Sequence, residues 1–304
     1  MGCGRWTADD WKRYSTSNIK GRGVAEIYSS RNMKKEYNPF GVKFRESRDS
    51  MEHENSTPII IGLDVTGSMG RILEVTAKCL GDMVKEILDR KPVSDPQIMF
   101  SAIGDAMCDS APLQVTQFES DIRIASQLTD LWFERGGGGN NFESYPLIWY
   151  FAANHIVTDA WEKRKEKGFI FTMGDDCYPE KLTAAELKRF IGDDISEDIS
   201  TEALYAQISR KYNVFHLMLE QGGSASIMKP DKWRNLMGER AISVSDYNCI
   251  PQIIVSLIET TKGKDTEEVI SSWDKSTQIA VRKAIGNLAV NQDKKSIFSR
   301  FIKF

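Results

Sequence analysis

The sequence predicts an α/β protein with three layers, in which helices flank a mostly parallel sheet. Short apolar runs bounded by turn residues recur at Ile59–Leu63, Gln97–Ile103 and Gly168–Met173. Runs of this kind are typical of strands that are buried on both faces. Amphipathic patterns with helical spacing separate them, the longest from Ile72 to Leu88. Strands that alternate with helices favour a parallel sheet with helices on both sides.

Length and composition are compatible with this fold. The chain has 304 residues, of which 41% are hydrophobic, and one α/β domain of about 200 residues with flanking arms fits best. The formal net charge of −3 predicts no general attraction to nucleic acid or to anionic membranes. No apolar run reaches the roughly 18 residues of a membrane span, and the N-terminus has no signal-peptide core.

The cysteines and histidines indicate a reducing compartment. Five cysteines are scattered along the chain, no two of them close together, and there are only three histidines. This pattern favours neither a disulfide framework nor a zinc knuckle. We therefore expect a cytoplasmic protein.

Residues 1–57 show little periodicity and are expected to form an N-terminal arm. Six large aromatic residues are spread among polar ones: Trp6, Trp11, Tyr14, Tyr28, Tyr37 and Phe40. Because such side chains are rarely left in solvent, we expect them to pack on the main domain; a partner-binding segment is the alternative. Val42–Phe44 is a candidate edge strand before a charged linker.

The elements of the first half follow from periodicity. The first strand is expected at Ile59–Asp64, and the helix after it at Gly70–Arg90, where apolar residues recur every three or four positions. The run Gln97–Ile103 is the second strand. Leu113–Phe118 alternates as an edge strand does, and Ile122–Trp132 is expected to be helical.

The same reasoning extends through the second half. Helices are expected at Tyr145–Trp161, Thr183–Ile191, Thr201–Tyr212, Asp231–Met237 and Ile250–Thr261, and strands at Gly168–Met173, Asn213–Leu219 and Ala241–Val244. One more helix, at about Glu267–Leu288, precedes a basic, aromatic tip at Lys294–Phe304. The expected organisation is an arm (1–57), a domain (58–262) and a C-terminal helical extension (263–304).

Oxygen-bearing side chains gather where the first strand ends. Asp64 closes the apolar run, and Thr66 and Ser68 follow at alternate positions. The carboxyl ends of parallel strands form the edge at which open α/β sheets bind ligands. One carboxylate and two hydroxyls are hard ligands that suit Mg²⁺ or Mn²⁺. The alternative is that the hydroxyls only cap the helix that begins near Met69.

Asp64-x-Thr66-x-Ser68 resembles the Asp-x-Ser/Thr-x-Ser signature of the von Willebrand factor A (vWA) domain family. In that family the signature is the first loop of the metal-ion-dependent adhesion site, or MIDAS. The resemblance covers about residues 58–261. It implies a Rossmann-like sheet and two further metal-binding loops.

The second of these loops corresponds to Gly136–Asn141. The family supplies a threonine there, and this chain has none. Asn140 is the expected ligand, with Asn141, or Glu143 acting through a water molecule, as alternatives. Four consecutive glycines are typical of a backbone that needs positive φ or that closely approaches a ligand.

The third loop departs from the family pattern as well. The usual Thr-Asp-Gly is replaced by Thr172-Met173-Gly174, so that a methionine occupies the aspartate position. Asp175 is the expected substitute and Asp176 the next candidate. Capping of a following helix by Asp175 is the alternative.

The resemblance implies a binding protein that is not an enzyme. In the vWA family, protein oxygens and waters surround Mg²⁺ or Mn²⁺, and an Asp or Glu of a protein partner completes the shell. Intracellular vWA proteins of bacteria and phages work beside AAA+ ATPases, so a partner in such a system is an expectation by fold-level analogy.

Other activities are less well supported by the sequence. A phosphohydrolase of the haloacid dehalogenase type needs an acid two residues after Asp64, where Thr66 stands. The glycines Gly136–Gly139 are a candidate phosphate cradle, but they follow a predicted helix, and no P-loop motif is present. Serine hydrolysis lacks both a nucleophile elbow at Ser68 and a suitable histidine, because His155 and His216 are expected to be structural.

An RNA-associated vWA protein is the remaining alternative. Residues 58–261 contain no basic patch, which argues against phosphate-backbone binding. The basic residues of the C-terminal tip are the exception: Lys294, Lys295, Arg300 and Lys303.

Overall fold

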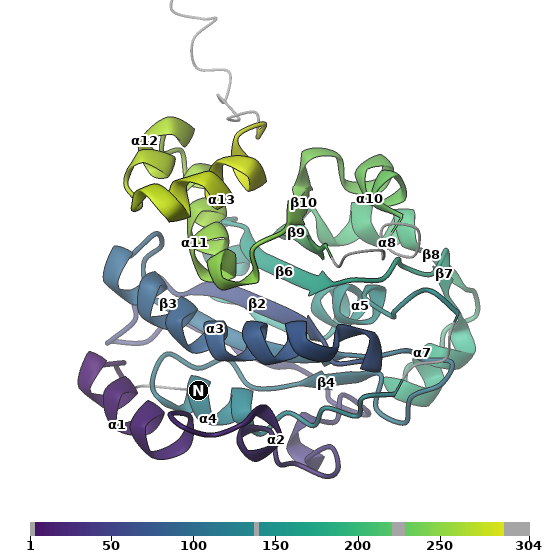
Figure 1. The fold of residues 1–304 in the computed structure, drawn as a ribbon. Coiled ribbons are helices and arrows are strands. Elements are labelled where there is room, and N and C mark those ends of the chain that lie inside the picture. Colours follow the sequence, from purple (N-terminus) through teal and green to yellow (C-terminus); the bar gives the residue numbers. More distant parts are fainter. Residues whose placement is uncertain (1–3, 137–139, 221–228, 289–304) are drawn as a thin grey trace, which may run out of the picture.

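The computed structural model describes residues 4–136, 140–220 and 229–288, and its centre is a six-stranded sheet (Figure 1). The strand order is β10-β9-β6-β2-β3-β4, and only the pair β3–β4 is antiparallel. The strands are β2 (Thr57–Asp64), β3 (Pro96–Ile103), β4 (Leu113–Val115), β6 (Gly168–Gly174), β9 (Tyr212–Leu219) and β10 (Ala241–Val244). The predicted mostly parallel α/β fold is confirmed.

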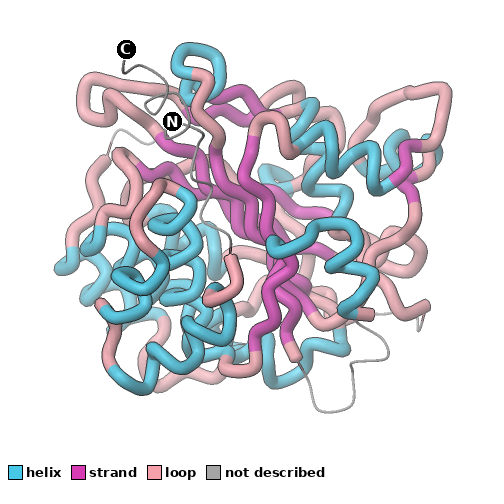
Figure 2. The backbone as a smooth tube through the Cα atoms, turned by 90° about the horizontal axis from the view of Figure 1, so that it is seen from above, coloured by secondary structure: helices cyan, strands magenta, loops and turns pink. Residues whose placement is uncertain are grey.

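Helices cover both faces of this sheet, as the view from above shows (Figure 2). Successive residues of a strand point to opposite faces, so Ile59 and Ile61 belong to one hydrophobic core and Ile60 to the other. The first core includes residues of α3 (Gly70–Arg90), α4 (Arg123–Thr129), α11 (Ile250–Thr261), α12 (Thr266–Ser271) and α13 (Lys275–Ile285). The second includes residues of α5 (Pro146–Asn154), α7 (Ala184–Phe190), α8 (Thr201–Ile208) and α10 (Pro230–Met237).

Strand β2 lies inside this sandwich, and every one of its eight residues is buried. Its apolar run follows from this position, because neither face of the strand meets water. In the sheet register, Ile61 is paired with Phe100 of β3 and with Phe171 of β6. The neighbouring parallel strands therefore end at the same edge as Asp64.

The N-terminal segment contains more regular structure than its sequence predicts. It forms α1 (Ala8–Asn18), capped by the Thr7 side chain, and the short α2 (Val24–Ile27). Tyr28 is buried and stacks on Phe133 with ring centroids 4.1 Å apart. Phe40 remains 57% exposed, so not all of the aromatic residues pack on the domain.

The predicted helix at 145–161 is wrong. The chain there forms helix α5, strand β5 and helix α6, which span Pro146–Asn154, Ile156–Thr158 and Asp159–Arg164. Strand β5 pairs in parallel with β1 (Arg45–Ser47) in a separate two-stranded sheet. The edge strand predicted at Val42–Phe44 is therefore displaced by three residues. Because β1 comes from the distant N-terminal segment, local periodicity does not indicate this pairing.

The single C-terminal helix predicted at 267–288 is also wrong. It is divided into α12 and α13, and the Asp274 side chain caps the second helix by accepting from the backbone N–H groups of Ser276 and Thr277. Between the two helices, the indole of Trp273 donates to Ser256 Oγ at 2.8 Å. The predicted basic tip lies outside the described residues.

Other differences concern element ends. The helix predicted at Thr201–Tyr212 ends at Ile208, and Tyr212 already belongs to β9. The edge strand predicted at Leu113–Phe118 is shorter and spans only Leu113–Val115. The remaining short elements are the 3-10 turns Lys35–Tyr37, Gly67–Met69, Gly238–Arg240 and Tyr247–Cys249 and the strands β7 (Lys181–Leu182) and β8 (Ile199–Ser200). In the described ranges, no helix is both long and apolar enough to cross a membrane. The domain boundaries at 57/58 and 262/263 stay a prediction.

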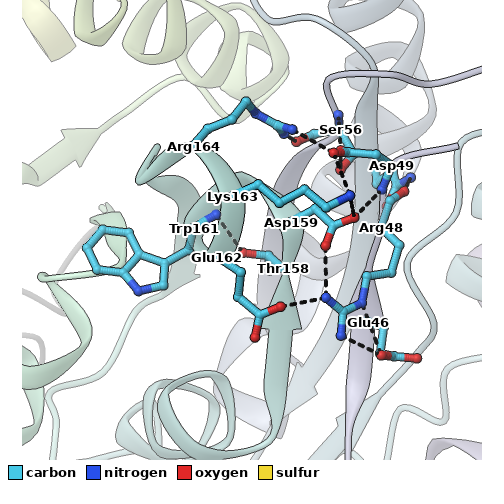
Figure 3. A network of polar contacts seen from close by, with 11 residues as sticks. Glu46, Arg48, Asp49, Ser56, Thr158, Asp159, Trp161, Glu162, Lys163 and Arg164 are labelled. Carbon is cyan, nitrogen blue, oxygen red and sulfur yellow. Dashed lines mark hydrogen bonds and ion pairs between the residues drawn. The ribbon is translucent and has the colours of Figure 1, made fainter.

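A network of ion pairs ties the linker after β1 to α6 (Figure 3). Arg48 Nη1 lies 2.8 Å from Asp159 Oδ1 and 2.6 Å from Glu162 Oε2, and Arg164 pairs with Asp49 at 2.7 Å. Burial opposes the ionisation of Asp159. Hydrogen bonds from Lys163, from the backbone of Asp49 and from Arg48 outweigh it, and they lower the pKa of Asp159 to about 2.

We predict that Asp159→Asn lowers the free energy of unfolding by about 2 kcal/mol at neutral pH, since charge-assisted hydrogen bonds contribute roughly 1.5–3 kcal/mol. The folded pKa lies below the ordinary value of 3.8. The wild type therefore keeps this contribution above pH 3.8 and loses it as the pH falls through 2. Urea unfolding at several pH values measures the difference. If the difference in the free energy of unfolding between wild type and variant were the same at pH 2 as at neutral pH, the stabilising role of the ionised Asp159 carboxylate would be contradicted.

The matched control is Glu166→Gln on the same surface. The Glu166 side chain is 52% exposed and lies 4.0 Å from Arg164 Nε. Exposed pairs of this kind contribute little, so a change within about 0.5 kcal/mol is expected.

Candidate metal centre

Four of the predicted site residues come together at the carboxyl end of β2. Asp64 is wholly buried, and its Oδ1 accepts from the backbone N of Thr66 at 2.9 Å and from Thr66 Oγ1 at 2.6 Å. Thr66 Oγ1 lies 3.1 Å from Ser68 Oγ, which donates to Asp175 Oδ1 at 3.0 Å. Two loops that are far apart in the sequence thus share one continuous set of carboxylate and hydroxyl oxygens.

Tyr145 and Gly174 determine the surroundings of the other oxygen of Asp64. Tyr145 Oη donates to Asp64 Oδ2 at 2.8 Å. A Cβ on Gly174 would overlap Tyr145 Oη and would lie only 2.6 Å from Asp64 Oδ2. The glycine therefore provides the room in which the tyrosine and the aspartate meet. Met173, at the family's aspartate position, is buried in the core.

Burial and mutual repulsion act on these carboxylates. Burial raises the pKa of Asp64, the charge of Asp175 raises it further, and the hydrogen bonds from Thr66 oppose both. Burial, followed by the charge of Asp175, raises the pKa of Asp176 to about 6. Both shifts disfavour the ionised forms of Asp64 and Asp176, and added positive charge, such as that of a bound cation, would oppose them.

The second loop places its three candidate ligands differently. The Asn140 amide donates to Asp105 Oδ2 at 2.7 Å, so this side chain contacts the loop after β3. Asn141 is exposed, with φ of 62°. Glu143 is buried, and its backbone N–H donates to Cys177 O at 2.9 Å, which ties it to the third loop. Asn140 as a metal ligand stays a prediction, and Glu143 is the candidate that lies among the buried carboxylates.

Asp105 and Tyr145 were not among the predicted site residues. Asp105 comes two residues after the end of β3, and Asp64 is the last residue of β2, so the place of Asp105 in the sequence is a usable signal. Tyr145 had no such signal, because its contact with Asp64 joins residues 81 positions apart.

The donor set fits a hard divalent cation. Among the residues that the structure describes, no three His, Cys, Asp or Glu side chains form a group that could hold a metal ion. The set at Asp64 is of another kind, with two carboxylates, Asp64 and Asp175, and two hydroxyls, Thr66 and Ser68. Such oxygen donors suit Mg²⁺, which keeps several waters in its shell.

The two histidines inside the domain have structural contacts. His216 is wholly buried, its Nδ1 lies 2.9 Å from Thr172 Oγ1, and its ring stacks on Trp233. Burial holds the pKa of His216 well below its usual range, so the ring is neutral. The ring of His155 lies between two oxygens: its Nδ1 is 2.9 Å from the carbonyl oxygen of Val42, and its Nε2 is 2.8 Å from Asp193 Oδ2. In the part of the chain that the structure describes, neither ring forms a hydrogen bond with the hydroxyl of Thr66 or Ser68.

The third histidine belongs to a Ser–His–Asp series that the sequence did not indicate. His53 Nε2 lies 3.1 Å from Ser120 Oγ, and Nδ1 lies 3.4 Å from Asp95 Oδ1, beside a cavity of about 500 Å³. The carbonyl oxygen of Gly4 lies 3.1 Å from the ring and 3.0 Å from the hydroxyl. Because backbone occupies the position that a substrate would need, we interpret the series as a clamp on the N-terminal segment.

No family model matches the sequence, and no curated protein matches it. Similar solved structures include the pilus adhesin SpaC from Lactobacillus rhamnosus GG in an open conformation, with a TM-score of 0.47 and 8% identity over 71% of this chain and 31% of that one. Proximal thread matrix protein 1 from the mussel byssus has a TM-score of 0.45 and 10% identity over 67% of this chain and 47% of that one.

Another structure of that mussel protein, described as having a zinc-occupied MIDAS motif, has a TM-score of 0.43 and 10% identity over 72% of this chain and 48% of that one. The chain spans less than half the length of each of these proteins. Identities and TM-scores this low establish no shared ligand, partner or activity.

We predict that Gly174→Ala destabilises the protein by about 3 kcal/mol, because the added methyl group overlaps Tyr145 Oη and crowds Asp64. Adding Tyr145→Phe removes one of the two clashes, so the double variant should recover part of the loss. Denaturant unfolding of the two single variants and the double variant measures the coupling. Gly23→Ala is the control, because its Cβ meets only the Glu26 carboxylate at 3.6 Å. Strictly additive effects would show that the two residues do not share this space.

Proposed function

We propose that this protein is a vWA-type interaction module that binds a carboxylate of a protein partner through a metal ion and catalyses no reaction. The observation that carries the proposal is the hydrogen-bonded series Asp64–Thr66–Ser68–Asp175, which joins loops 107 residues apart. Helix capping alone would not require Ser68 to contact Asp175. Hydroxyls that link two buried carboxylates are the donors expected at a MIDAS-like centre.

In this proposal Asp64, Thr66, Ser68 and Asp175 hold Mg²⁺ or Mn²⁺. When bound, the ion supplies a Lewis-acid position at which an Asp or Glu side chain of the partner completes the shell. The chain's own contribution is orientation, since Tyr145 and the Thr66 backbone each fix one oxygen of Asp64.

The setting that we propose is the cytoplasm, with a protein partner that belongs to an AAA+ ATPase system. All four cysteines within the described residues are free thiols: Cys79, Cys108, Cys177 and Cys249. Free thiols support a reducing compartment. The buried acidic residues at the candidate centre oppose the approach of nucleic-acid phosphates.

We predict that Asp64→Asn abolishes both cation binding and partner capture while the fold is retained. Thermal unfolding of the wild type should shift upward with Mg²⁺, by about 2.7 kcal/mol of stabilisation at 100 times the dissociation constant. The variant should show no shift. Pull-downs from native lysate, with and without EDTA, should show partners that the wild type loses in EDTA and that the variant never captures.

The control is Asp231→Asn on α10, where the carboxylate is 96% exposed. It should behave as the wild type in both assays. Partner capture that survives EDTA, or an Asp64→Asn variant that still gains stability from Mg²⁺, would contradict the proposed function.

A further inference from the structure

Trp233 of α10 is wholly buried in the second hydrophobic core, and its indole is bonded to the third loop. Its Nε1 donates to the backbone carbonyl oxygen of Asp176 at 3.2 Å, and the two residues are 57 positions apart. Asp176 directly follows Asp175, the proposed metal ligand of that loop. Breaking a buried bond of this kind leaves a donor and an acceptor unsatisfied. The bond therefore restrains the backbone next to Asp175.

The ring of Trp233 also contacts the side chain that orients Asp64. It stacks on His216 with ring centroids 3.6 Å apart, and it meets the ring of Tyr145 edge to face at 5.5 Å. Tyr145 is the residue whose hydroxyl donates to Asp64 Oδ2. One side chain thus contacts both the tyrosine that orients Asp64 and the loop that carries Asp175.

A neighbouring residue of α10 holds the same loop. Lys232 Nζ donates to Tyr178 O at 3.2 Å, and Tyr178 Oη donates to the carbonyl oxygen of Lys232 at 3.1 Å. Lys232 also pairs with Glu180. The Tyr178 ring meets that of Trp233 edge to face at 4.6 Å. Helix α10 therefore bonds to the backbone of the third loop at two places, Asp176 and Tyr178.

Trp149 of α5 provides an internal comparison. It is also wholly buried in the second core, and its ring centroid lies 6.3 Å from that of Trp233. In the described part of the chain, its indole nitrogen has no hydrogen-bond partner. The two tryptophans share the same core, but of the two only Trp233 is bonded to a loop of the candidate centre.

We propose that Trp233 is a positioning residue of the metal centre. By holding the third loop against Tyr145, its indole sets the position of the Asp175 carboxylate relative to that of Asp64. Mg²⁺ demands a nearly ideal octahedral shell, so its affinity is sensitive to such positions. This role rests on the proposed function, because it requires that Asp64 and Asp175 hold a cation.

The experiment compares Trp233→Phe with Trp149→Phe in the full chain by calorimetric titration with Mg²⁺. Both variants replace a buried indole by a smaller ring, so both should unfold at a lower temperature than the wild type in EDTA. Trp233→Phe should also weaken Mg²⁺ binding at least tenfold, as is typical when a residue that orients metal ligands is lost. Trp149→Phe should bind Mg²⁺ as the wild type does. Equal Mg²⁺ affinities of the two variants would overturn the proposal.

A second pair of variants applies if Trp233→Phe does not fold. Lys232→Met removes the bond to Tyr178 O at a side chain that is 26% exposed, outside the core. Lys181→Met removes the same charge, and Lys181 pairs instead with Asp198 at 2.7 Å. Loss of a positive charge by itself favours cation binding. Weaker Mg²⁺ binding in Lys232→Met than in Lys181→Met supports the proposal, and equal or tighter binding overturns it.

A third measurement needs no metal. Ser68 holds the third loop by donating to Asp175 Oδ1, so Ser68→Ala is combined with each tryptophan variant in EDTA. With Trp233→Phe, the losses in unfolding temperature should be less than additive, because either substitution already loosens the loop. With Trp149→Phe they should be additive. Additive losses in both double variants would overturn the proposal.

Failure of the proposed function has a different signature. A wild type that binds no Mg²⁺, or partner capture that survives EDTA, would contradict that function. The double variants in EDTA would still test the link between Trp233 and the third loop. A wild type that binds Mg²⁺ and captures its partner only without EDTA, together with equal Mg²⁺ affinities of the two tryptophan variants, would retain the function and remove the role of Trp233.

Discussion

The burial of the Asp64 carboxylate at the end of a wholly enclosed strand is the constraint around which this edge of the molecule is arranged. A carboxylate in that position is removed from water, so its oxygens need donors or a cation. Thr66 and Tyr145 supply donors, and Gly174 supplies the space. The residues that meet at Asp64 come from the end of β2, from the loop before α5 and from the end of β6. Their contacts with one carboxylate hold these three parts of the chain close together.

The acidic residues of the protein fall into two groups with different physical roles. Around the β1 linker and α6, and at α11, buried acids face arginine or lysine, and these pairs join segments that are distant in the sequence. At the carboxyl edge of the sheet, buried acids face one another instead. The first group stabilises the fold by pairing charges. The second is unfavourable unless positive charge is added, which is why we interpret it as a centre for cations.

Elements with strong periodicity were predictable, and elements that depend on distant partners were not. Strand β2 and helix α3 agree with the sequence pattern. Burial of both faces of the strand requires a continuous apolar run, and burial of one face of the helix requires apolar residues every three or four positions. Strand β5 is not predictable from local pattern because its partner β1 lies in the N-terminal segment. Ile156 is a strand residue only through its pairing with Arg45, and the two are far apart in the sequence. The break before α13 was missed although Asp274 is a good capping residue, because the apolar stripe continues across it.

By itself, the sequence determined the α/β class, the place of Asp64 at a strand end and the two hydroxyls that follow it. These features are encoded within a few neighbouring residues, where strand period and turn chemistry act locally. Only the tertiary structure decided which residues of the second and third loops meet them: Asp175 bonds to Ser68, Asn140 turns to Asp105, and Glu143 lies among the acids. Those contacts join loops that the parallel strands bring to one edge, and no local pattern specifies the distances between them.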